Sequence, residues 1–146
     1  MKSVAHILKA KLDQTIYRIA PTASVFEAVR MMADKNIGAL VVMEGEKIVG
    51  IITERDYARK IVLMARSLKE TPVRDIMTSS VMYVSPTHRS EECMALMTEN
   101  RVRHLLVIDN GKLIGLVSIG DLVKATISEQ QFIIQQLEHY ITGAPI

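Results

Sequence analysis

The chain has 146 residues, of which 49% are hydrophobic and 23% charged, and its formal net charge is +2. Such a composition is typical of a globular protein, and this length allows roughly 68 to 70% of the unfolded surface to be buried. The basic residues are scattered and the chain has four Tyr, two Phe and no Trp. Neither the basic surface nor the aromatic stacking platforms of a nucleic-acid-binding protein are therefore expected.

The one cysteine and the hydropathy pattern indicate a reducing compartment. Cys93 excludes an internal disulfide, and it falls on the apolar side of a predicted helix, where an inert buried thiol is expected. The N-terminus lacks the continuous apolar core of a signal peptide, and no stretch approaches the ~20 apolar residues of a membrane span. We expect a cytoplasmic protein that does not enter a membrane.

The first elements are short and occur twice. Residues 4–8 predict one helical turn, and residues 73–77 predict its counterpart, with Thr71 as N-cap and Pro72 at the first helical position. Residues 16–19 and 81–84 predict brief strands, each ended by a proline. The helical turns are 69 residues apart and the strands 65, so the loop over residues 9–15 carries four extra residues, where an insertion costs little.

A helix is predicted after each brief strand. Ser24 is the expected N-cap of the first, with Glu27 reaching back to it, and the predicted core face is Val25, Ala28, Val29, Met32 and Ala33. The second runs to about Asn100 and keeps its stripe through Cys93, Met94 and Met97. Arg89 stands where Ser24 would cap, so this helix is expected to begin one residue later or less firmly.

Two hairpins and three further helical segments complete the pattern. Hairpins are predicted for residues 39–43 with 48–52 and for 105–108 with 113–117, the second through the strong turn signal Asn110-Gly111. A helix is expected from Glu54 to about Arg66, with Ala58, Ile61, Val62 and Ala65 inward, and another from Ile119 onward. Residues 67–70 are the linker between the copies. Residues 128–141 form an amphipathic tail whose apolar face is Ile133, Ile134, Leu137 and Ile141.

The chain is an internal duplication, because residues 16–61 align without a gap over residues 81–126. Each copy ends its last strand on Gly and two apolar residues, followed by a hydroxyl residue and then Asp three positions later: Thr53 with Asp56, and Ser118 with Asp121. Two interpretations stay open. The pair is a capping box at a helix start, or it is an anion site at a helix N-terminus with a carboxylate that accepts hydrogen bonds from a ribose diol.

Two copies of strand, helix, hairpin and helix that close on this motif resemble a tandem pair of CBS domains, named after cystathionine beta-synthase. The resemblance covers nearly the whole chain. It implies an α/β fold of two β-α-β-β-α repeats about a pseudo-twofold axis, the first in residues 1–70 and the second, with the C-terminal helix, in residues 71–146. CBS pairs are commonly dimers, so a homodimer covering the apolar tail is favoured over a tail packed on its own core.

The resemblance also implies a ligand site. In CBS pairs an adenosine ligand lies in a cleft between the copies, with its ribose on the closing Asp, here Asp56 or Asp121, and the preceding Thr53 or Ser118 near the phosphate. The adenine would be held by backbone of Ile16, Tyr17, Ile37, Gly38 and Ala39 in the first copy, and of Met82, Tyr83, Val102, Arg103 and His104 in the second. Arg55, Arg103 and His104 would supply positive charge. Plain interpretations stay open beside these roles: a solvated Arg55, Tyr17 and Tyr83 as packing residues, and His104 as a core histidine.

The sequence departs from the common family pattern at two positions. Leu106 stands where a Pro often occurs, which bears on strand geometry, and Gly120 stands where the first copy has Arg55. The first copy has Gly38-Ala39 where the second has Arg103-His104. These unlike linings predict unlike occupants, a small one such as AMP and a larger one such as ATP or NAD(H).

The expected function is therefore regulatory: an adenine-nucleotide sensor that signals to an effector protein in trans. No histidine pair stands at metal-ligand spacing with a third donor, and no Gly-rich phosphate loop or nucleophile elbow is present. We therefore expect no metal, no catalytic residue and no enzyme activity. Two alternatives remain: a dimerisation scaffold whose aspartates are only helix caps, and an enzyme that processes nucleotides.

Overall fold

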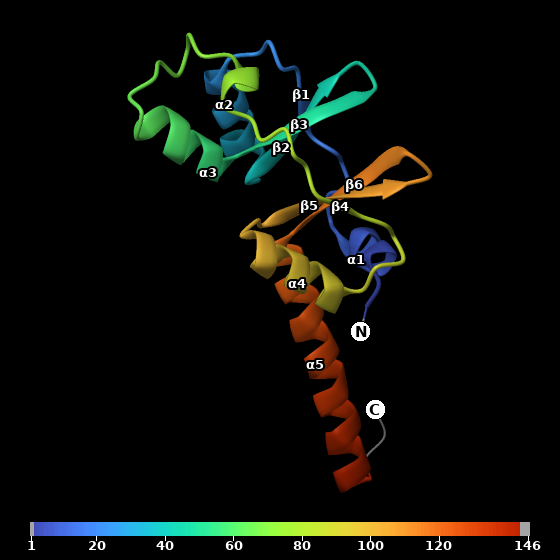
Figure 1. Cartoon of the computed structure of the whole chain (residues 1–146). Coiled ribbons are helices and arrows are strands. Elements are labelled where there is room, and N and C mark those ends of the chain that lie inside the picture. Colours follow the sequence, from blue (N-terminus) through green and yellow to red (C-terminus); the bar gives the residue numbers. More distant parts are fainter. Residues whose placement is uncertain (1, 144–146) are drawn as a thin grey trace. The chain divides into compact units, whose positions relative to one another are not determined.

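A computed structural model describes residues 2–143, and these residues form two compact units (Figure 1). One unit consists of residues 16–81, and the other combines the residues up to 15 with those from 82 onward. Each unit holds a three-stranded sheet and its helices, so the α/β fold is confirmed. The units exchange their leading helices: α1 (Val4–Ala10) belongs with the second copy, and η2 (Val73–Asp75) with the first. The repeat boundary between residues 70 and 71 thus differs from the division into compact units.

The unit of residues 16–81 contains the sheet β1-β2-β3, in which β1 is parallel to β2 and β2 antiparallel to β3. Its elements are β1 (Arg18–Ile19), α2 (Val25–Lys35), β2 (Ala39–Glu44) and β3 (Lys47–Thr53). Ser24 caps α2 as predicted, because its side chain accepts the N–H of Glu27 at 3.1 Å. Most of the predicted face is buried or half-buried, whereas Ala33 is exposed. The N-cap of η2 is Pro72, not Thr71, whose carbonyl is used by the N–H of Val25.

The helix after β3 differs from its prediction. It begins as α3 (Glu54–Asp56) and continues as the π-helix η1 (Tyr57–Val62), in which the N–H of Leu63 reaches the carbonyl of Ala58. The wider turn shifts the side chains away from a 3.6-residue period. Ile61 is therefore buried as expected, while the other three residues of the predicted inward face, Ala58, Val62 and Ala65, are exposed.

The other unit has the sheet β4-β5-β6 with the same pairing. Its elements are α1, β4 (Tyr83–Val84), α4 (Ser90–Asn100), β5 (His104–Asp109), β6 (Lys112–Ser118) and α5 (Ile119–Thr142). Asn110 and Gly111 both have positive φ, as the predicted hairpin turn requires. Of the two expectations for α4, a later start or a less firm one, the later start is wrong: α4 begins at Ser90, in the same register as α2, and the Glu92 carboxylate accepts the N–H of Arg89.

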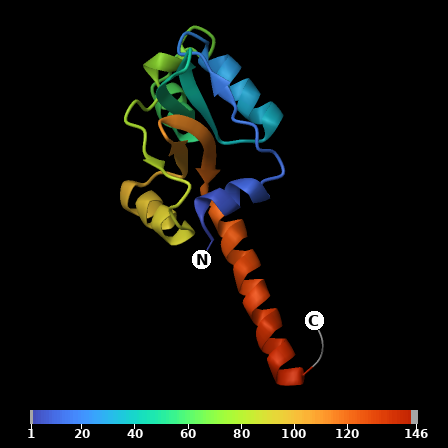
Figure 2. The same cartoon turned by 90° about the vertical axis from the view of Figure 1, so that its right-hand side faces the viewer.

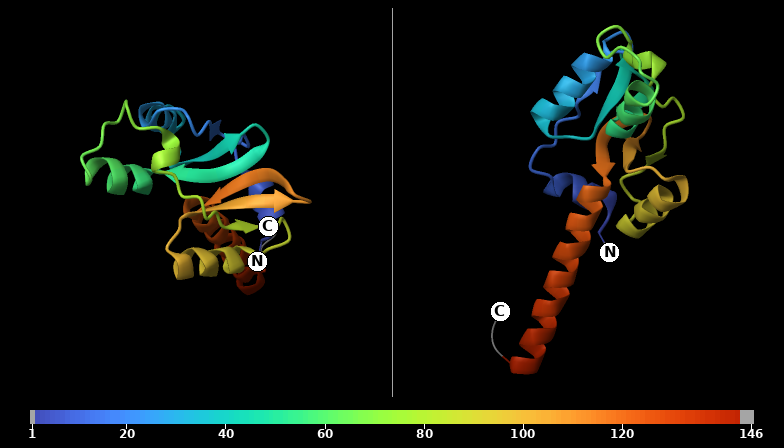
Figure 3. Two further views of the ribbon diagram at one scale, coloured as in Figure 1. Left: turned by 45° about the horizontal axis from the view of Figure 1, so that its top comes forward. Right: turned by 90° about the vertical axis from the view of Figure 1, so that its left-hand side faces the viewer.

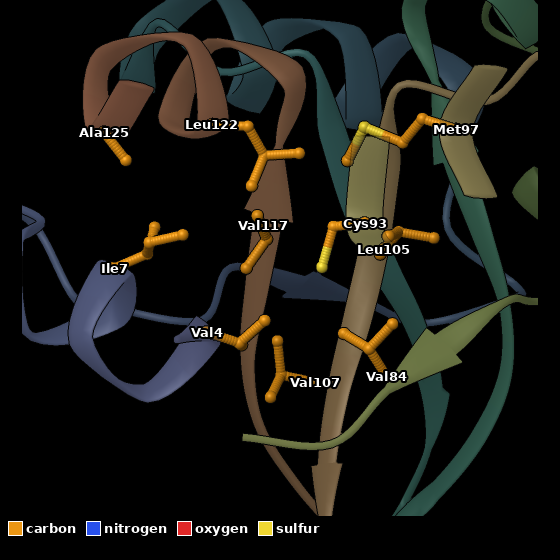
Figure 4. Packing of buried hydrophobic residues seen from close by; sticks show 10 residues of the cluster. All are labelled: Val4, Ile7, Val84, Cys93, Met97, Leu105, Val107, Val117, Leu122 and Ala125. Carbon is orange, nitrogen blue, oxygen red and sulfur yellow. The ribbon is translucent and has the colours of Figure 1, made fainter. Parts of the chain in front are cut away.

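The core of this second unit depends on the N-terminal helix (Figure 4). Val4 and Ile7 of α1 are buried in the same cluster as Val84, Cys93 and the strands β5 and β6. The N–H of Val4 donates to the carbonyl of His88 at 2.8 Å, which fixes α1 beside the loop before α4. Cys93 is fully buried as predicted, and burial, together with the Glu92 carboxylate, raises the pKa of its thiol.

α5 is one continuous helix of 24 residues, so the helix expected from Ile119 onward and the amphipathic tail of residues 128–141 form a single element. Leu122 and Ala125 anchor its first turns in the core, and Figures 2 and 3 show the helix continuing well beyond the sheet of its unit. Its later apolar residues are exposed. None of the helices among residues 2–143 combines the length and apolar character needed to cross a membrane.

We call residues 2–15 and 71–80, which precede the first strand of each copy, the leading segments, and β3 and β6 the closing strands. The glycine of each closing strand lies against the leading segment of the other copy. Beside Gly50, Ile51 and Thr78 exchange two backbone hydrogen bonds of 2.9 and 2.8 Å, and a Cβ on Gly50 would lie 2.7 Å from the Thr78 carbonyl oxygen. A Cβ on Gly115 would lie 2.7 Å from the side chain of Leu8. The first obstacle is backbone, which cannot move without breaking the bridge, whereas the second is the end of a flexible side chain.

We therefore expect Gly50→Ala to lower the free energy of unfolding by about 2 to 4 kcal/mol, and Gly115→Ala by about half as much, because Leu8 can change rotamer. Urea denaturation of both variants measures the difference. The matched pair has the same chemistry at equivalent positions of the duplication. Equal losses in the two variants would contradict the role assigned to the Thr78 backbone.

Candidate functional site

The first closing motif is a complete capping box at the start of α3. The backbone N–H of Thr53 donates to Oδ2 of Asp56 at 3.0 Å, and the N–H of Asp56 donates to Oγ1 of Thr53 at 3.3 Å. The Thr53 hydroxyl also donates to Oδ2, at 3.2 Å. The capping interpretation of this motif is therefore correct for the structure as it stands.

The other carboxylate oxygen of Asp56, Oδ1, contacts a residue of the leading segment of the second copy. Oδ1 accepts the hydroxyl of Thr78 at 3.2 Å and lies 3.7 Å from Nζ of Lys60. Lys60 in turn donates to the carbonyl of Ile76 at 2.9 Å. Asp56 is 8% exposed, so this carboxylate is held by neutral donors and one partly exposed ammonium group.

The second closing motif repeats the capping box at the start of α5. The N–H of Ser118 donates to Oδ2 of Asp121 at 2.9 Å, and the N–H of Asp121 donates to Oγ of Ser118 at 3.1 Å. Nζ of Lys11 lies 3.2 Å from the same Oδ2 and donates to the carbonyl of Leu116 at 2.9 Å. The contacts of Asp121 thus converge on one oxygen, with a lysine as the charged partner.

The two copies differ in what the leading segment brings to the closing Asp. Leu116 is the repeat equivalent of Ile51, whose backbone pairs with that of Thr78. In the second copy the carbonyl at this position accepts an ammonium group instead. The leading segment therefore brings a neutral hydroxyl to Asp56, whose ammonium partner Lys60 comes from its own helix, and it brings an ammonium group to Asp121. Neither Thr78 nor Lys11 was among the predicted site residues, although the four extra residues over 9–15 indicated that the two leading segments differ.

The turn before the hairpin lies against the closing motif in each unit. We call residues 37–39 and 102–104 the pre-hairpin turns. The carbonyl of Gly38 accepts the N–H of Glu54 at 3.1 Å, and the carbonyl of Arg103 accepts the N–H of Ile119 at 2.9 Å. Ala39 is paired with Thr53, and His104 with Ser118, in the sheets. Ile37 and Val102 are half-buried at the start of these turns. The structure thus brings the predicted turn residues together with the predicted phosphate and ribose residues of the same copy.

The predicted residues of the first brief strand lie on the opposite side of the hairpin strand. The sheet orders place β1 and β4 two strands away from β3 and β6. The carbonyls of Tyr17 and Met82 accept the N–H groups of Val41 and Leu106, so they are used within the sheets. Ile16 is half-buried, the Tyr17 ring lies 5.6 Å from Nζ of Lys35, and Tyr83 is exposed.

The cationic character expected of the second pre-hairpin turn is reduced. Burial lowers the pKa of His104 to about 4, against the opposing effect of the Asp121 carboxylate, while Lys11 and Arg103 lower it further. His104 is therefore neutral at pH 7 and supplies no positive charge, contrary to our expectation. Arg55, in the first copy, is half-buried, and Arg103 is exposed. The cationic groups of the second copy are Lys11, which lies beside Asp121, and Arg103, whose charge acts on His104. Within residues 2–143 no cluster of three His, Cys, Asp or Glu side chains is arranged to hold a metal ion.

The depressed pKa of His104 predicts a stability loss in mild acid. The unfolded chain binds a proton near pH 6.5 and the folded chain only near pH 4, so this contribution to stability is complete above about pH 6.5 and is lost as the pH falls toward 4. Between pH 7.5 and 5 the free energy of unfolding should fall by about 1 to 2 kcal/mol more in the native chain than in His104→Gln. Urea titrations at both pH values test this, with the exposed His6→Gln as control. Parallel pH profiles for the native chain and His104→Gln would contradict it.

Comparison with known proteins agrees with the duplication. The CBS domain family matches residues 12–63 and 73–128. The CBS domain-containing protein CBSX3, mitochondrial, of Arabidopsis thaliana is 46% identical over 125 residues, which cover 82% of this chain and 61% of that protein. The solved structure of a protein with CBS domains from Burkholderia ambifaria MC40-6 has 58% identity and a TM-score of 0.86, and the match covers 88% of this chain and 96% of that one.

More distant structures share the fold. A hexameric CBS-CP12 protein from bloom-forming cyanobacteria has 27% identity and a TM-score of 0.73 over 84% of this chain and 70% of its own. The CBS domain protein PAE2072 from Pyrobaculum aerophilum, complexed with AMP, has 24% identity and a TM-score of 0.72 over 82% of this chain and 89% of its own. Both copies of the repeat match the family model, and closely similar proteins carry the same domains along most of this chain. The chain therefore belongs to the CBS domain family, with two CBS domains.

Proposed function

We propose that this CBS pair is a regulatory module that binds adenine nucleotides and acts on an effector protein in trans. The observation that carries the proposal is the repeated arrangement at each closing motif. In both copies the helix after the closing strand has a hydroxyl residue as its N-cap and a carboxylate at its third position. The carbonyl of the pre-hairpin turn accepts the first N–H of the same helix. A cap alone accounts for the hydroxyl and the carboxylate, but ribose and phosphate need the same groups in the same places. The protein of the same fold that is complexed with AMP supports this choice of ligand.

The second copy offers the stronger half-site for phosphate. Ser118 begins a regular helix of 24 residues, whereas Thr53 begins three α-helical residues followed by a π-helix. An α-helix N-terminus attracts anions, and Lys11 and Arg103 add two cationic side chains near it. Because the described contacts of Asp121 use Oδ2, its Oδ1 is the oxygen proposed to accept a ribose hydroxyl. We therefore assign the ligand with more phosphates, ATP or NAD(H), to the second copy and AMP to the first.

The exposed apolar side of α5 supports the second part of the proposal, a homodimer. Ile134, Leu137 and Ile141 are each more than half exposed on one face of a helix that leaves its own core after Ala125. Apolar residues repeated along a helix face are typical of a helix that packs on another element. The CBS-CP12 protein, which shares this fold, is hexameric, and this supports an oligomeric assembly for the present chain.

Binding of AMP, ADP, ATP or NAD(H) to the folded form should raise the midpoint of thermal unfolding. At ~100 times its dissociation constant a ligand adds ~2.7 kcal/mol, which corresponds to a rise on the order of 5 to 10 °C for a chain of this size. The double variant Asp56→Asn with Asp121→Asn should lose the shift and only part of its stability. If no nucleotide shifts the native protein, or if the double variant keeps the full shift, the nucleotide assignment is wrong and the scaffold alternative gains.

The charge of Lys11 should distinguish the two half-sites. Lys11→Met removes the ammonium group beside Asp121, so it should weaken binding of ATP or NAD(H) by about 10-fold to 100-fold, the effect of losing one charge-assisted hydrogen bond. Binding of AMP should change little. The matched control is Lys60→Met, which removes the lysine beside Asp56 in the first copy. Calorimetric titrations in which both variants weaken all nucleotides alike would exclude this assignment.

A further inference from the structure

The exposed apolar residues of α5 follow a heptad repeat. Ile127, Ile134 and Ile141 are spaced by seven residues, and Val123, Gln130 and Leu137 alternate with them at intervals of three and four. These two series occupy the a and d positions of a coiled coil, and all but Gln130 are apolar. We call these six residues the α5 seam. Each of its five apolar members is at least 47% exposed within this chain.

The α5 seam faces away from the core of its own unit. Leu122 and Ala125, which anchor α5, lie on a different side of the helix from Val123 and Ile127, because neighbours in the sequence are rotated by about 100°. The seam therefore continues without interruption from the anchored turns to the end of the helix. At 1.5 Å per residue its length from Val123 to Ile141 is about 27 Å.

We infer that the α5 seam binds the same seam of a second copy, with the two helices antiparallel and centred on residue 132. This inference rests on the proposed homodimer and specifies its geometry. In this register every seam residue faces another: Val123 packs on the partner subunit's Ile141, Ile127 on the partner subunit's Leu137, and Gln130 on the partner subunit's Ile134. A shift of one heptad in either direction would leave apolar layers uncovered.

The residues flanking the seam favour the antiparallel orientation. One flank is polar, with Lys124, Gln131 and Glu138, and the other has Thr126, Ile133 and Tyr140. In an antiparallel pair each flank faces the same flank of the partner subunit. Lys124 therefore faces the partner subunit's Glu138, and this contact occurs twice, once at each end of the pair.

The other flank then places Ile133 against the partner subunit's Ile133 next to the twofold axis, and Thr126 against the partner subunit's Tyr140. In a parallel pair the flanks would mix, with Glu138 against the partner subunit's Ile133 and Lys124 against the partner subunit's Ile119. Parallel pairing would give two matched polar contacts, Gln130 on its own copy and Thr126 on the partner subunit's Gln131, and no pair of opposite charges. Only the antiparallel pair brings Lys124 and the partner subunit's Glu138 together, so the complementary charges select that orientation.

Disulfide trapping distinguishes the orientations. Val123→Cys and Ile141→Cys are prepared separately, and each is reduced and then oxidised alone or after mixing with the other. An antiparallel pair brings the two different cysteines together, so the mixture should give several-fold more cross-linked dimer than either variant alone. The native chain is the control, because its Cys93 is buried. Cross-linking of Val123→Cys with itself would show a parallel pair and overturn the inference.

Charge exchange gives an independent readout without cysteines. Lys124→Glu alone and Glu138→Lys alone should each raise the dimer dissociation constant by about tenfold, since two attractive pairs become repulsive, and the double variant should restore it. Phe132→Ala is the matched control, because Phe132 is exposed on α5 outside the seam. No restoration in the double variant would overturn the antiparallel register.

A native chain that light scattering finds monomeric would overturn the homodimer as well, while nucleotide shifts on the same samples test ligand binding separately.

Discussion

The carboxylate at the third position of each helix after a closing strand is the group on which both the fold and the proposed site depend. Asp56 and Asp121 each complete a capping box, and each also contacts the leading segment that comes from the other copy. One side chain therefore fixes the helix start and helps to hold the exchanged segment. A ligand that binds this carboxylate would compete with or add to those contacts. The proposed nucleotide binding would therefore be coupled to the attachment of the leading segments, which gives a physical route from a nucleotide to a change in the protein.

Duplication produced two copies with the same framework and different chemistry at this carboxylate. In the first copy the glycine, the backbone bridge at Ile51 and the Thr78 hydroxyl form one uncharged unit. In the second copy the longer loop lets Lys11 take the place of that bridge and bring its charge to Asp121. The helices that follow diverge as well, because the first widens into a π-helix and the second continues regularly for 24 residues. The two half-sites differ most in the groups that would contact phosphate.

Local signals predicted most of the fold. The Asn110-Gly111 turn and the Ser24 cap each depend on neighbouring residues, and each was confirmed. The failures have physical causes of longer range. The apolar residues after Asp56 repeat with an α-helical period, but residues 57–62 form a π-helix. Ala58, Val62 and Ala65 were therefore wrongly predicted to face inward. The amphipathic tail of residues 128–141 was described apart from the helix that begins at Ile119, because the repeat ends near residue 126, and the structure joins the two in one helix.

The candidate site was predictable in its repeated parts and not in its exchanged parts. The hydroxyl and carboxylate of each closing motif are visible in one window of sequence, and the duplication draws attention to them. Lys11 contacts a strand 105 residues further along the chain, and no local pattern indicates that contact. The neutral state of His104 also depends on burial by distant elements, so a charge count of the sequence overstated the positive charge of its turn.

Native mass spectrometry of the purified protein tests the central claim most directly, because it reports bound nucleotide and subunit count in one spectrum. The account predicts a dimer whose mass increases by whole adenine nucleotides, either copurified or after addition of AMP, ATP or NAD(H). It also predicts that the increase disappears when Asp56 and Asp121 are both replaced by Asn. A protein that keeps its bare mass at saturating concentrations of each nucleotide would contradict the account and leave the two aspartates as helix caps alone.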